Sequence, residues 1–437
     1  MRALLVRLHR WAGLFIALFL IVAGLTGAVI SWDQEIDAAL NPHLHQARPG
    51  EAPRSPFELA REIERRHPQV QVTTIPLAVE PEHSLAFSVW GRFNPRTDRL
   101  IEPGYNQIFV DPVSGEELGR RFWGAAWPLN RETFVSFLYV LHYSLHLPAL
   151  GGIDEWGVWL MGGIALLWTI DCFTGFALSL PRPKTSERSA DVRADISGKP
   201  GKATNWWQRW KPAWQIRWRG GTYKLNFDLH RAGALWTWGL LFIIAFTGFS
   251  LNLYEDVFEP AMSAVSEVTP TPYDSRARVE SRQIAVPKIP YEAALEIAKG
   301  EAARRHWQEP AGAITWSRHH GFYDVAFYPP GARYATGGAV HRTLYVDAHD
   351  GTIIGDEEPW KGTAADIFLQ AQFPVHSGRI LGLPGRILIS LMGLVIAMLS
   401  VTGIIIWWRK RRARAARQPG RKPARSTVPA GDLHAVE

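Results

Sequence analysis

The sequence predicts an α-helical membrane protein in which four transmembrane helices form two parallel repeats, each repeat carrying an exterior α+β module. Three observations support this prediction. The 437-residue chain gathers its apolar residues into four runs of roughly membrane length, separated by long polar segments. The tripeptide Leu-His-Arg lies at the start of the first run and again at the start of the third. The polar segments also end in similar turns, so one unit is used twice and in the same orientation.

Composition excludes several classes of protein. The hydrophobic fraction of 47% is ordinary for a soluble protein, so much of the chain lies outside the membrane. The net charge is +7, and the basic residues cluster beside the apolar runs, as they do in the cytoplasmic flanks of membrane helices. The positive charge therefore indicates no nucleic-acid partner. The single cysteine, Cys172, excludes an internal disulfide and cysteine-ligated iron–sulfur clusters. The 15 histidines make haem or a metal ion the natural redox centre.

The first apolar run, 9–32, is interpreted as a transmembrane helix with a cytoplasmic N-terminus. Arg2, Arg7 and Arg10 precede or begin it, so a cleaved signal peptide is the alternative. The run is long for a signal peptide, and its counterpart lies in mid-chain where nothing is cleaved. A transmembrane helix is therefore the favoured interpretation.

Residues 33–137 are polar and predict the first exterior module. A helix is expected over 55–67, because Pro56 stands near its start and acidic residues follow. Alternating stretches predict strands at 70–77, 85–90 and 108–110. The sequence Asp-Pro-Val-Ser-Gly at 111–115 predicts a turn.

Residues 138–180 hold a histidine-bearing segment and the second transmembrane helix, expected from residue 156. Residues 181–229 follow as a basic cytoplasmic loop with tryptophans four apart, from Trp206 to Trp218. Such a stripe is typical of a segment lying in the membrane interface, although Pro212 argues against one unbroken helix. A docking face for an electron donor is the less favoured interpretation.

The second half repeats this order. The third helix is expected over 230–254, the second exterior module over 255–375, the second histidine-bearing segment and fourth helix over 376–408, and a basic cytoplasmic tail over 409–437. Within the second module the sequence predicts a helix at 291–305, strands at 314–316, 323–327 and 343–346, and a turn at 347–351.

Four histidines occupy matching places in the two halves. His9 and His230 begin the first and third helices, while His142 and His376 precede the second and fourth. Ionisable groups at membrane depth suggest function, and two imidazoles from facing helices can take both axial positions of a haem iron. The sequence therefore predicts two haems, one near each membrane face. In the alternative interpretation, these histidines lie at the membrane interface and bind no haem. His146 is an alternative to His142 as the haem ligand from the first half of the chain.

Three further residues could support the haems. Asp171 lies inside the second helix, where it could hydrogen-bond a haem group, take part in proton movement, or be protonated and bonded to a neighbouring helix. Arg379 and Arg386 follow His376 among glycines and mark a possible exit site for electrons. They could pair with haem propionates, lipid headgroups or substrate. No residue is assigned a catalytic role.

Several motifs together resemble the PepSY-associated transmembrane-helix proteins. They are L-H-R-W-A-G-L at 8–14, D-L-H-R-A-G-A-L-W at 228–236, L-H-Y-S-L at 141–145, V-H-S-G-R-I-L-G-L-P-G-R at 375–386 and T-G-I-I-I-W-W-R-K at 402–410. The resemblance covers nearly the whole chain to about residue 412. It implies that the exterior modules are PepSY-like domains. Members of this family that are associated with siderophore uptake resemble inner-membrane reductases with b-type haem.

The sequence thus predicts a multi-pass protein of the bacterial inner membrane, with both termini cytoplasmic and both modules periplasmic. It would carry electrons from an unknown cytoplasmic or membrane donor to ferric iron in a siderophore, acting as a ferric-siderophore reductase. Two alternatives stay open: another periplasmic acceptor on the same scaffold, and a non-enzymatic PepSY sensor or peptidase modulator in the lipid bilayer.

Overall fold

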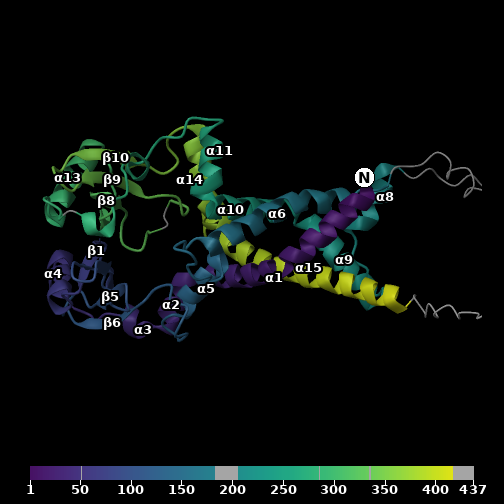
Figure 1. The fold of residues 1–437 in the computed structure, drawn as a ribbon, viewed down its shortest axis with the longest axis horizontal. Helices are drawn as coiled ribbons and strands as arrows, with labels where there is room; N and C mark the ends of the chain where they lie inside the picture. Colours follow the sequence, from purple (N-terminus) through teal and green to yellow (C-terminus); the bar gives the residue numbers. More distant parts are fainter. Residues whose placement is uncertain (51, 183–204, 285, 334–335, 417–437) are drawn as a thin grey trace, which may run out of the picture.

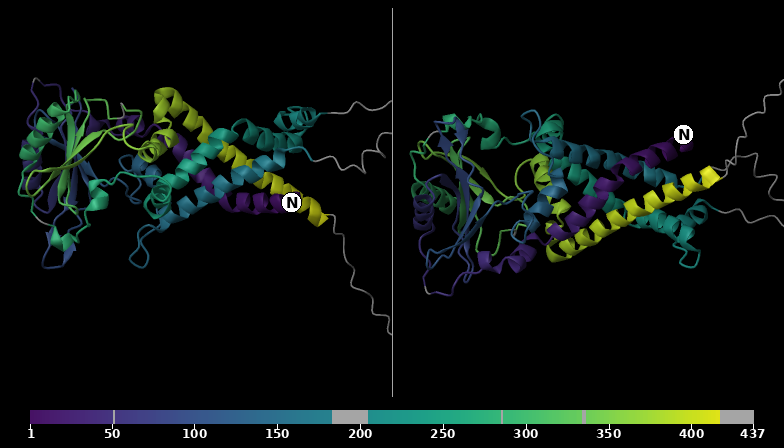
Figure 2. Two further views of the ribbon diagram at one scale, coloured as in Figure 1. Left: turned by 90° about the horizontal axis from the view of Figure 1, so that it is seen from above. Right: turned by 60° about the horizontal axis from the view of Figure 1, so that its bottom comes forward.

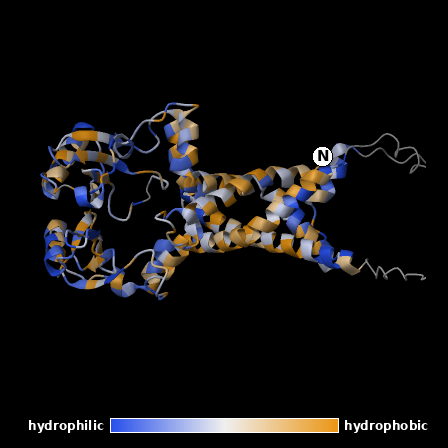
Figure 3. Ribbon diagram, viewed as in Figure 1, coloured by the Kyte–Doolittle hydropathy of each residue, from blue (hydrophilic) through white to orange (hydrophobic). Residues whose placement is uncertain are grey.

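The structure is a helical bundle with a β-sheet at one end (Figure 1). It is a computed structural model that describes residues 1–50, 52–182, 205–284, 286–333 and 336–416. Apolar residues are concentrated along the bundle, and polar residues cover the sheet and the opposite tip of the bundle (Figure 3). The predicted basic loop and basic tail lie partly outside the described residues, at 183–204 and 417–437.

Three described helices are long and apolar enough to cross a membrane: α1 (Arg2–Ile30), α6 (Trp156–Ser179) and the segment Arg379–Ala416, which contains η4 (Arg379–Leu381) and α15 (Gly382–Ala416). A fourth span exists if α9 (Thr222–Trp236) and α10 (Trp238–Asn252) are counted together. Two shorter helices, α5 (Phe134–Ser144) and α14 (Ala364–His376), precede α6 and α15.

The prediction of one continuous helix over 230–254 is wrong. The chain bends by 72° between α9 and α10, and Thr237 between them leaves helical geometry. The indole of Trp236 donates to the carbonyl of Trp214, whereas the indole of Trp238 donates to the carbonyl of Cys172. These two bonds to different partners fix the directions of the two helices. The bend therefore has a tertiary cause.

Glycines set the closest contact between the long helices. Helices α1 and α15 can be traced by their purple and yellow colours in Figure 2. They come into contact at Gly24 and Gly393. A Cβ atom on Gly24 would lie 2.6 Å from the carbonyl oxygen of Gly393. Any larger residue would separate the backbones, which is why small residues are found at such membrane-helix crossings.

All the longer strands belong to one antiparallel sheet with the order β10-β9-β8-β7-β1-β2-β5-β6. Its strands are β1 (Val70–Pro76), β2 (Leu85–Gly91), β5 (Gln107–Val110), β6 (Glu117–Arg121), β7 (Ala311–Ser317), β8 (Phe322–Phe327), β9 (Arg342–Asp347) and β10 (Ile353–Glu357). β3 (Phe93–Asn94) and β4 (Arg99–Leu100) form a separate small pair.

The two predicted exterior modules are joined rather than separate. β1 of the first pairs with β7 of the second, in a register that places Thr74 opposite Thr315. The core of the sheet lies under α4 (Pro56–Arg66) and α13 (Tyr291–Arg304), on the face turned away from the bundle (Figure 1). Both helices lie close to their predicted positions. The opposite face of the sheet is turned toward the bundle.

Short elements connect the sheet to the bundle. They are α2 (Asp33–Leu40), α3 (Pro42–His45), η2 (Tyr254–Phe258), α11 (Glu259–Ser263), α12 (Pro272–Ser275) and η3 (Ser281–Gln283). The buried Asp37 on α2 accepts hydrogen bonds from His45 and from both terminal nitrogens of Arg121 on β6. Burial alone would raise the pKa of Asp37, but these bonds lower it to about 2. The end of α1 is thereby tied to the sheet.

Candidate functional site

The four histidines predicted as ligands lie in two facing pairs. His9 on α1 and His230 on α9 form the inner pair, with ring centroids 6.3 Å apart. His142 on α5 and His376 on α14 form the outer pair, nearer the sheet, with centroids 6.1 Å apart. Each pair joins one histidine from each half of the chain. The predicted pairing and the order of the pairs along the bundle both agree with this arrangement.

A threonine hydroxyl lies within hydrogen-bond distance of Nδ1 of each histidine in the outer pair. His142 Nδ1 lies 3.1 Å from the hydroxyl of Thr26 and 3.0 Å from the carbonyl of Ala23, both on α1. His376 Nδ1 lies 2.9 Å from the hydroxyl of Thr247 on α10. Each threonine donates its own hydroxyl proton to a carbonyl of its helix, at 2.7 Å. A carbonyl oxygen can only accept, so Nδ1 of His142 carries the proton, and a backbone group of Ile244 takes the same place beside His376.

His230 of the inner pair is held in the same way. Its Nδ1 lies 3.1 Å from the hydroxyl of Thr402 and 3.0 Å from the carbonyl of Leu399, both on α15. Thr402 in turn donates to the carbonyl of Met398 at 2.8 Å. His230 is therefore also protonated on Nδ1, and its Nε2 is left as a lone-pair donor.

His9 is held by a carboxylate instead. Its Nδ1 lies 2.9 and 3.0 Å from the two carboxylate oxygens of Asp171 on α6. Thr174 donates its hydroxyl to the same carboxylate. Of the three roles considered for Asp171, the structure shows the bond to a neighbouring helix, and the group bonded is a predicted ligand.

A glycine lies against each imidazole, one residue after the threonine. A Cβ atom on any of these glycines would lie 2.9 to 3.5 Å from the Cε1 atom of the adjacent ring. The four are Gly175 beside His9, Gly403 beside His230, Gly27 beside His142 and Gly248 beside His376. Each histidine thus lies against the glycine of a Thr-Gly step on a neighbouring helix. The tautomer of three rings is set by the threonine and backbone groups, and that of His9 by Asp171.

This geometry leaves the Nε2 atoms of four imidazoles available, in two pairs of neighbouring rings. Among the described residues, Nε2 of these histidines has no hydrogen-bond partner, and no cluster of three or more His, Cys, Asp or Glu could hold a metal. Two imidazoles on opposite sides of one metal, with bonds of about 2.0 Å, have ring centroids roughly 6 Å apart. A haem iron needs only two ligands from the protein, so the donor sets fit the predicted cofactor.

His146 does not take part in the outer pair. The helix α5 ends at Ser144, and both Leu145 and His146 have a positive φ, so His146 leaves the face that carries His142. Its ring stacks on Phe137, and its Nε2 bonds the carbonyl of Phe137 at 2.9 Å. The structure therefore places His142, and not His146, opposite His376.

The two arginines after His376 pair with acidic residues of α2. Arg379 is buried and donates to Asp33 at 3.1 Å, and Arg386 donates to Glu35 at 2.7 Å. Arg386 also lies over the ring of Trp32, with the guanidinium carbon 4.4 Å from the ring centre. These contacts brace the start of α15 against the end of α1. The contacts of these arginines with propionates, headgroups or substrate stay predictions.

The D-L-H-R motif has a structural basis at the start of the bent span. Asp228 is fully buried and accepts hydrogen bonds from Arg217 and Arg231. Arg217 belongs to the Trp-rich loop, so the ion pair ties this loop to α9 two residues before His230. The loop is thereby held close to the inner pair.

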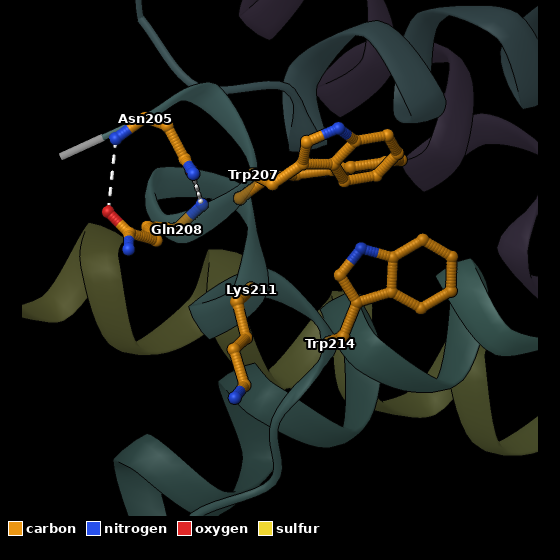
Figure 4. Close-up of a pocket in the computed structure, with 6 residues that line it drawn as sticks. Asn205, Trp207, Gln208, Lys211 and Trp214 are labelled. Carbon is orange, nitrogen blue, oxygen red and sulfur yellow. Dashed lines mark hydrogen bonds between the residues drawn. The ribbon is translucent and has the colours of Figure 1, made fainter.

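The Trp-rich loop forms an aromatic pocket beside the inner pair. It consists of α8 (Trp206–Trp210) and the 3₁₀ turn η1 (Lys211–Trp214), a break that Pro212 predicted. The pocket is lined by Asn205, Trp207, Gln208, Trp210, Lys211 and Trp214. Trp207 and Trp214 turn their rings to one side, and Asn205 and Gln208 cap α8 reciprocally (Figure 4). Trp210 packs edge-on against Phe176, the residue after the glycine beside His9.

The sequence interpretation missed the role of the Thr-Gly steps. Each of the four apolar runs contains one such step. The steps are Thr26-Gly27, Thr174-Gly175, Thr247-Gly248 and Thr402-Gly403. Their recurrence was visible, but their use as supports for histidines requires the packing of the helices to be known.

Comparison with known families agrees with the motifs. A family model described as the PepSY-associated TM region matches residues 6–410. No curated protein matches the chain.

Proposed function

We propose that this chain, which belongs to the family of the PepSY-associated TM region, is a dihaem b-type reductase of the bacterial inner membrane. In this proposal His9 and His230 hold the inner haem, and His142 and His376 hold the outer one. A haem iron with two imidazole ligands has no open coordination site and supplies one-electron transfer. The acceptor would be ferric iron in a siderophore, reduced on the sheet side of the membrane.

One observation carries the proposal: four imidazoles lie in two pairs, with ring centroids 6.3 and 6.1 Å apart, and each ring is bonded to its supports through Nδ1. Imidazoles at membrane depth are costly unless they are bonded or coordinate a metal. Here the backbone, the threonines and Asp171 satisfy Nδ1 only. Coordination of a haem iron accounts for Nε2 of each ring. A simple location at the membrane interface gives Nε2 no such role.

Charge supports the proposed orientation. Arg2, Arg7 and Arg10 begin α1, and a run of basic residues from Arg409 to Arg412 ends α15 at the same tip of the bundle. Lys and Arg flank cytoplasmic ends of membrane helices. The sheet would then be periplasmic, and the Trp pocket would lie on the cytoplasmic side, where the electron donor arrives.

The shared sheet alters the expected route of the acceptor. Two separate modules would allow an acceptor to approach between them, above the outer pair. Pairing of β1 with β7 joins the two modules into one sheet. We therefore place the acceptor between the sheet and the bundle. Hard oxygen donors hold Fe²⁺ less tightly than Fe³⁺, so reduction there would release the iron.

The test begins with the absorption spectrum and haem content of the purified full-length protein. Two haems per chain, each with the spectrum of a six-coordinate b-type centre, are expected. The reduced protein should be reoxidised by a ferric siderophore, with Fe²⁺ trapped by a coloured chelator. A colourless protein would contradict the proposal and favour the sensor. Two haems without siderophore-dependent reoxidation would favour a different periplasmic acceptor.

A further inference from the structure

The inner pair differs from the outer pair at one position. Three of the histidines face a backbone group three residues before the supporting threonine. The pairs of residues are Ala23 and Thr26 for His142, Ile244 and Thr247 for His376, and Leu399 and Thr402 for His230. At the fourth site the corresponding residue is Asp171, three before Thr174, and its side chain takes the place of the backbone carbonyl.

The carboxylate of Asp171 is isolated from other charges. Asp171 is 6% exposed, and His9 is its only ion-pair partner among the described residues. Its other bond comes from the neutral hydroxyl of Thr174. A buried carboxylate without an Arg or Lys partner is costly unless a cation lies close by. His9 and whatever its Nε2 binds are therefore the groups that must balance this charge.

We propose that Asp171 is a positioning residue that makes His9 the strongest donor of the four and lowers the reduction potential of the inner haem relative to the outer. The proposal rests on the proposed function. An imidazole whose N–H is bonded to a carboxylate is a more basic ligand than one bonded to a neutral oxygen. Stronger donation and a nearby negative charge both favour the oxidised iron. Bound haem would supply one-electron transfer, and this difference in potential would favour passage of an electron from the inner centre to the outer one, with no proton or bond exchanged.

The main test is redox titration of the purified dihaem protein carrying Asp171→Asn, with the outer haem as the internal control. The amide keeps the shape and removes the charge. The inner haem should become at least tenfold easier to reduce, about 59 mV for a one-electron couple, while the outer potential stays unchanged. Asp171→Glu, which restores the carboxylate, should recover most of the shift. A merely structural role predicts unchanged potentials instead.

A converse variant covers the case in which Asp171→Asn loses the inner haem. Ala23→Asp places a carboxylate at the corresponding position behind His142, and should make the outer haem harder to reduce. The proposal is overturned if the wild-type inner potential is not the lower one, if Asp171→Asn leaves it unchanged, or if Ala23→Asp leaves the outer potential unchanged. In all three cases two bound haems would still support the proposed function, whereas a protein without haem would contradict that function itself.

Discussion

The outer and inner pairs are built from the same parts and differ in one support. In the outer pair, both imidazoles bond a threonine hydroxyl and a backbone group, so the two halves of the chain contribute alike. In the inner pair, His230 has this support, whereas His9 bonds the carboxylate of Asp171. What both halves share reflects the requirement to hold an imidazole in a fixed tautomer. Asp171, which supports a histidine in only one half of the chain, indicates a function specific to the inner end of the bundle.

The largest expected effect comes from removing a ligand. His9→Ala or His230→Ala should abolish the inner haem and leave the outer one, and His142→Ala or His376→Ala should do the reverse. Each variant should bind about one haem per chain, because a single imidazole does not hold a six-coordinate centre. Haem content and spectrum measure this outcome.

His146→Ala is the matched control, since His146 bonds its own segment and lies away from His376. Full haem content in this variant would agree with the structure. If His146→Ala removes the outer haem and His142→Ala does not, the assignment of the outer pair is wrong.

The next effect concerns the Thr-Gly steps, which separate support of the ligand from ligation itself. Gly27→Val should displace His142, because even a Cβ atom would lie 2.9 Å from Cε1 of that ring. Outer haem content should fall several-fold while the inner haem is retained. Gly163→Ala on α6 is the control, because nothing lies within 4 Å of its Cβ position. Equal loss of both haems in Gly27→Val would indicate general misfolding and not a local clash.

Much of this architecture could be predicted from local patterns. Helix and strand periodicity placed the long helices and most strands of the sheet, because those patterns depend on neighbours in the sequence. The repeated Leu-His-Arg motif predicted that His9 lies opposite His230, because corresponding positions of a parallel repeat lie around a common axis. His142 and His376 followed from the same reasoning, although spacing could not separate His142 from His146.

The features that could not be predicted depend on contacts between distant segments. The bend at Thr237 is fixed by indole bonds to Trp214 and Cys172. The pairing of β1 with β7 joins strands more than 200 residues apart in sequence. The acidic partners of Arg379 and Arg386 lie on α2, at the other end of the chain. No local pattern encodes which surfaces meet in these cases.

A smaller effect is expected at the brace between α1 and α15. Arg379→Gln would leave the largely buried Asp33 without its cation, at a cost of about 3–5 kcal/mol. The melting temperature should fall, and the outer haem should be perturbed more than the inner because Arg379 follows His376 by three residues. Arg386→Gln is the milder comparison, since its partner Glu35 is half-exposed and such a pair contributes about 1 kcal/mol or less. Unchanged melting in both variants, with unchanged outer haem, would show that the brace is dispensable.

The smallest effect compares the two halves of the sheet. Asp324 on β8 lies opposite Thr315, and Ser88 on β2 takes the corresponding place opposite Thr74. Burial raises the pKa of Asp324 to about 6, from an ordinary value of 3.8, although a hydrogen bond from Tyr273 opposes the shift. The folded protein therefore binds this proton more tightly than the unfolded chain. Its stability should fall as pH rises from about 4 to about 6, and the full penalty persists above that pH.

Asp324→Asn removes the charge and should stabilise the protein at pH 7.5 by about 3 kcal/mol, with little effect near pH 4. Thermal unfolding of the full-length protein at several pH values measures this difference. Glu357, whose carboxyl pKa is also raised by burial, stays in the variant and leaves a residual pH dependence. Ser88→Asn provides the matched control, because it changes the corresponding position without removing a titrating group. A stability difference between Asp324→Asn and the wild type that does not vary with pH would show that packing, and not the buried charge, distinguishes the two halves of the sheet.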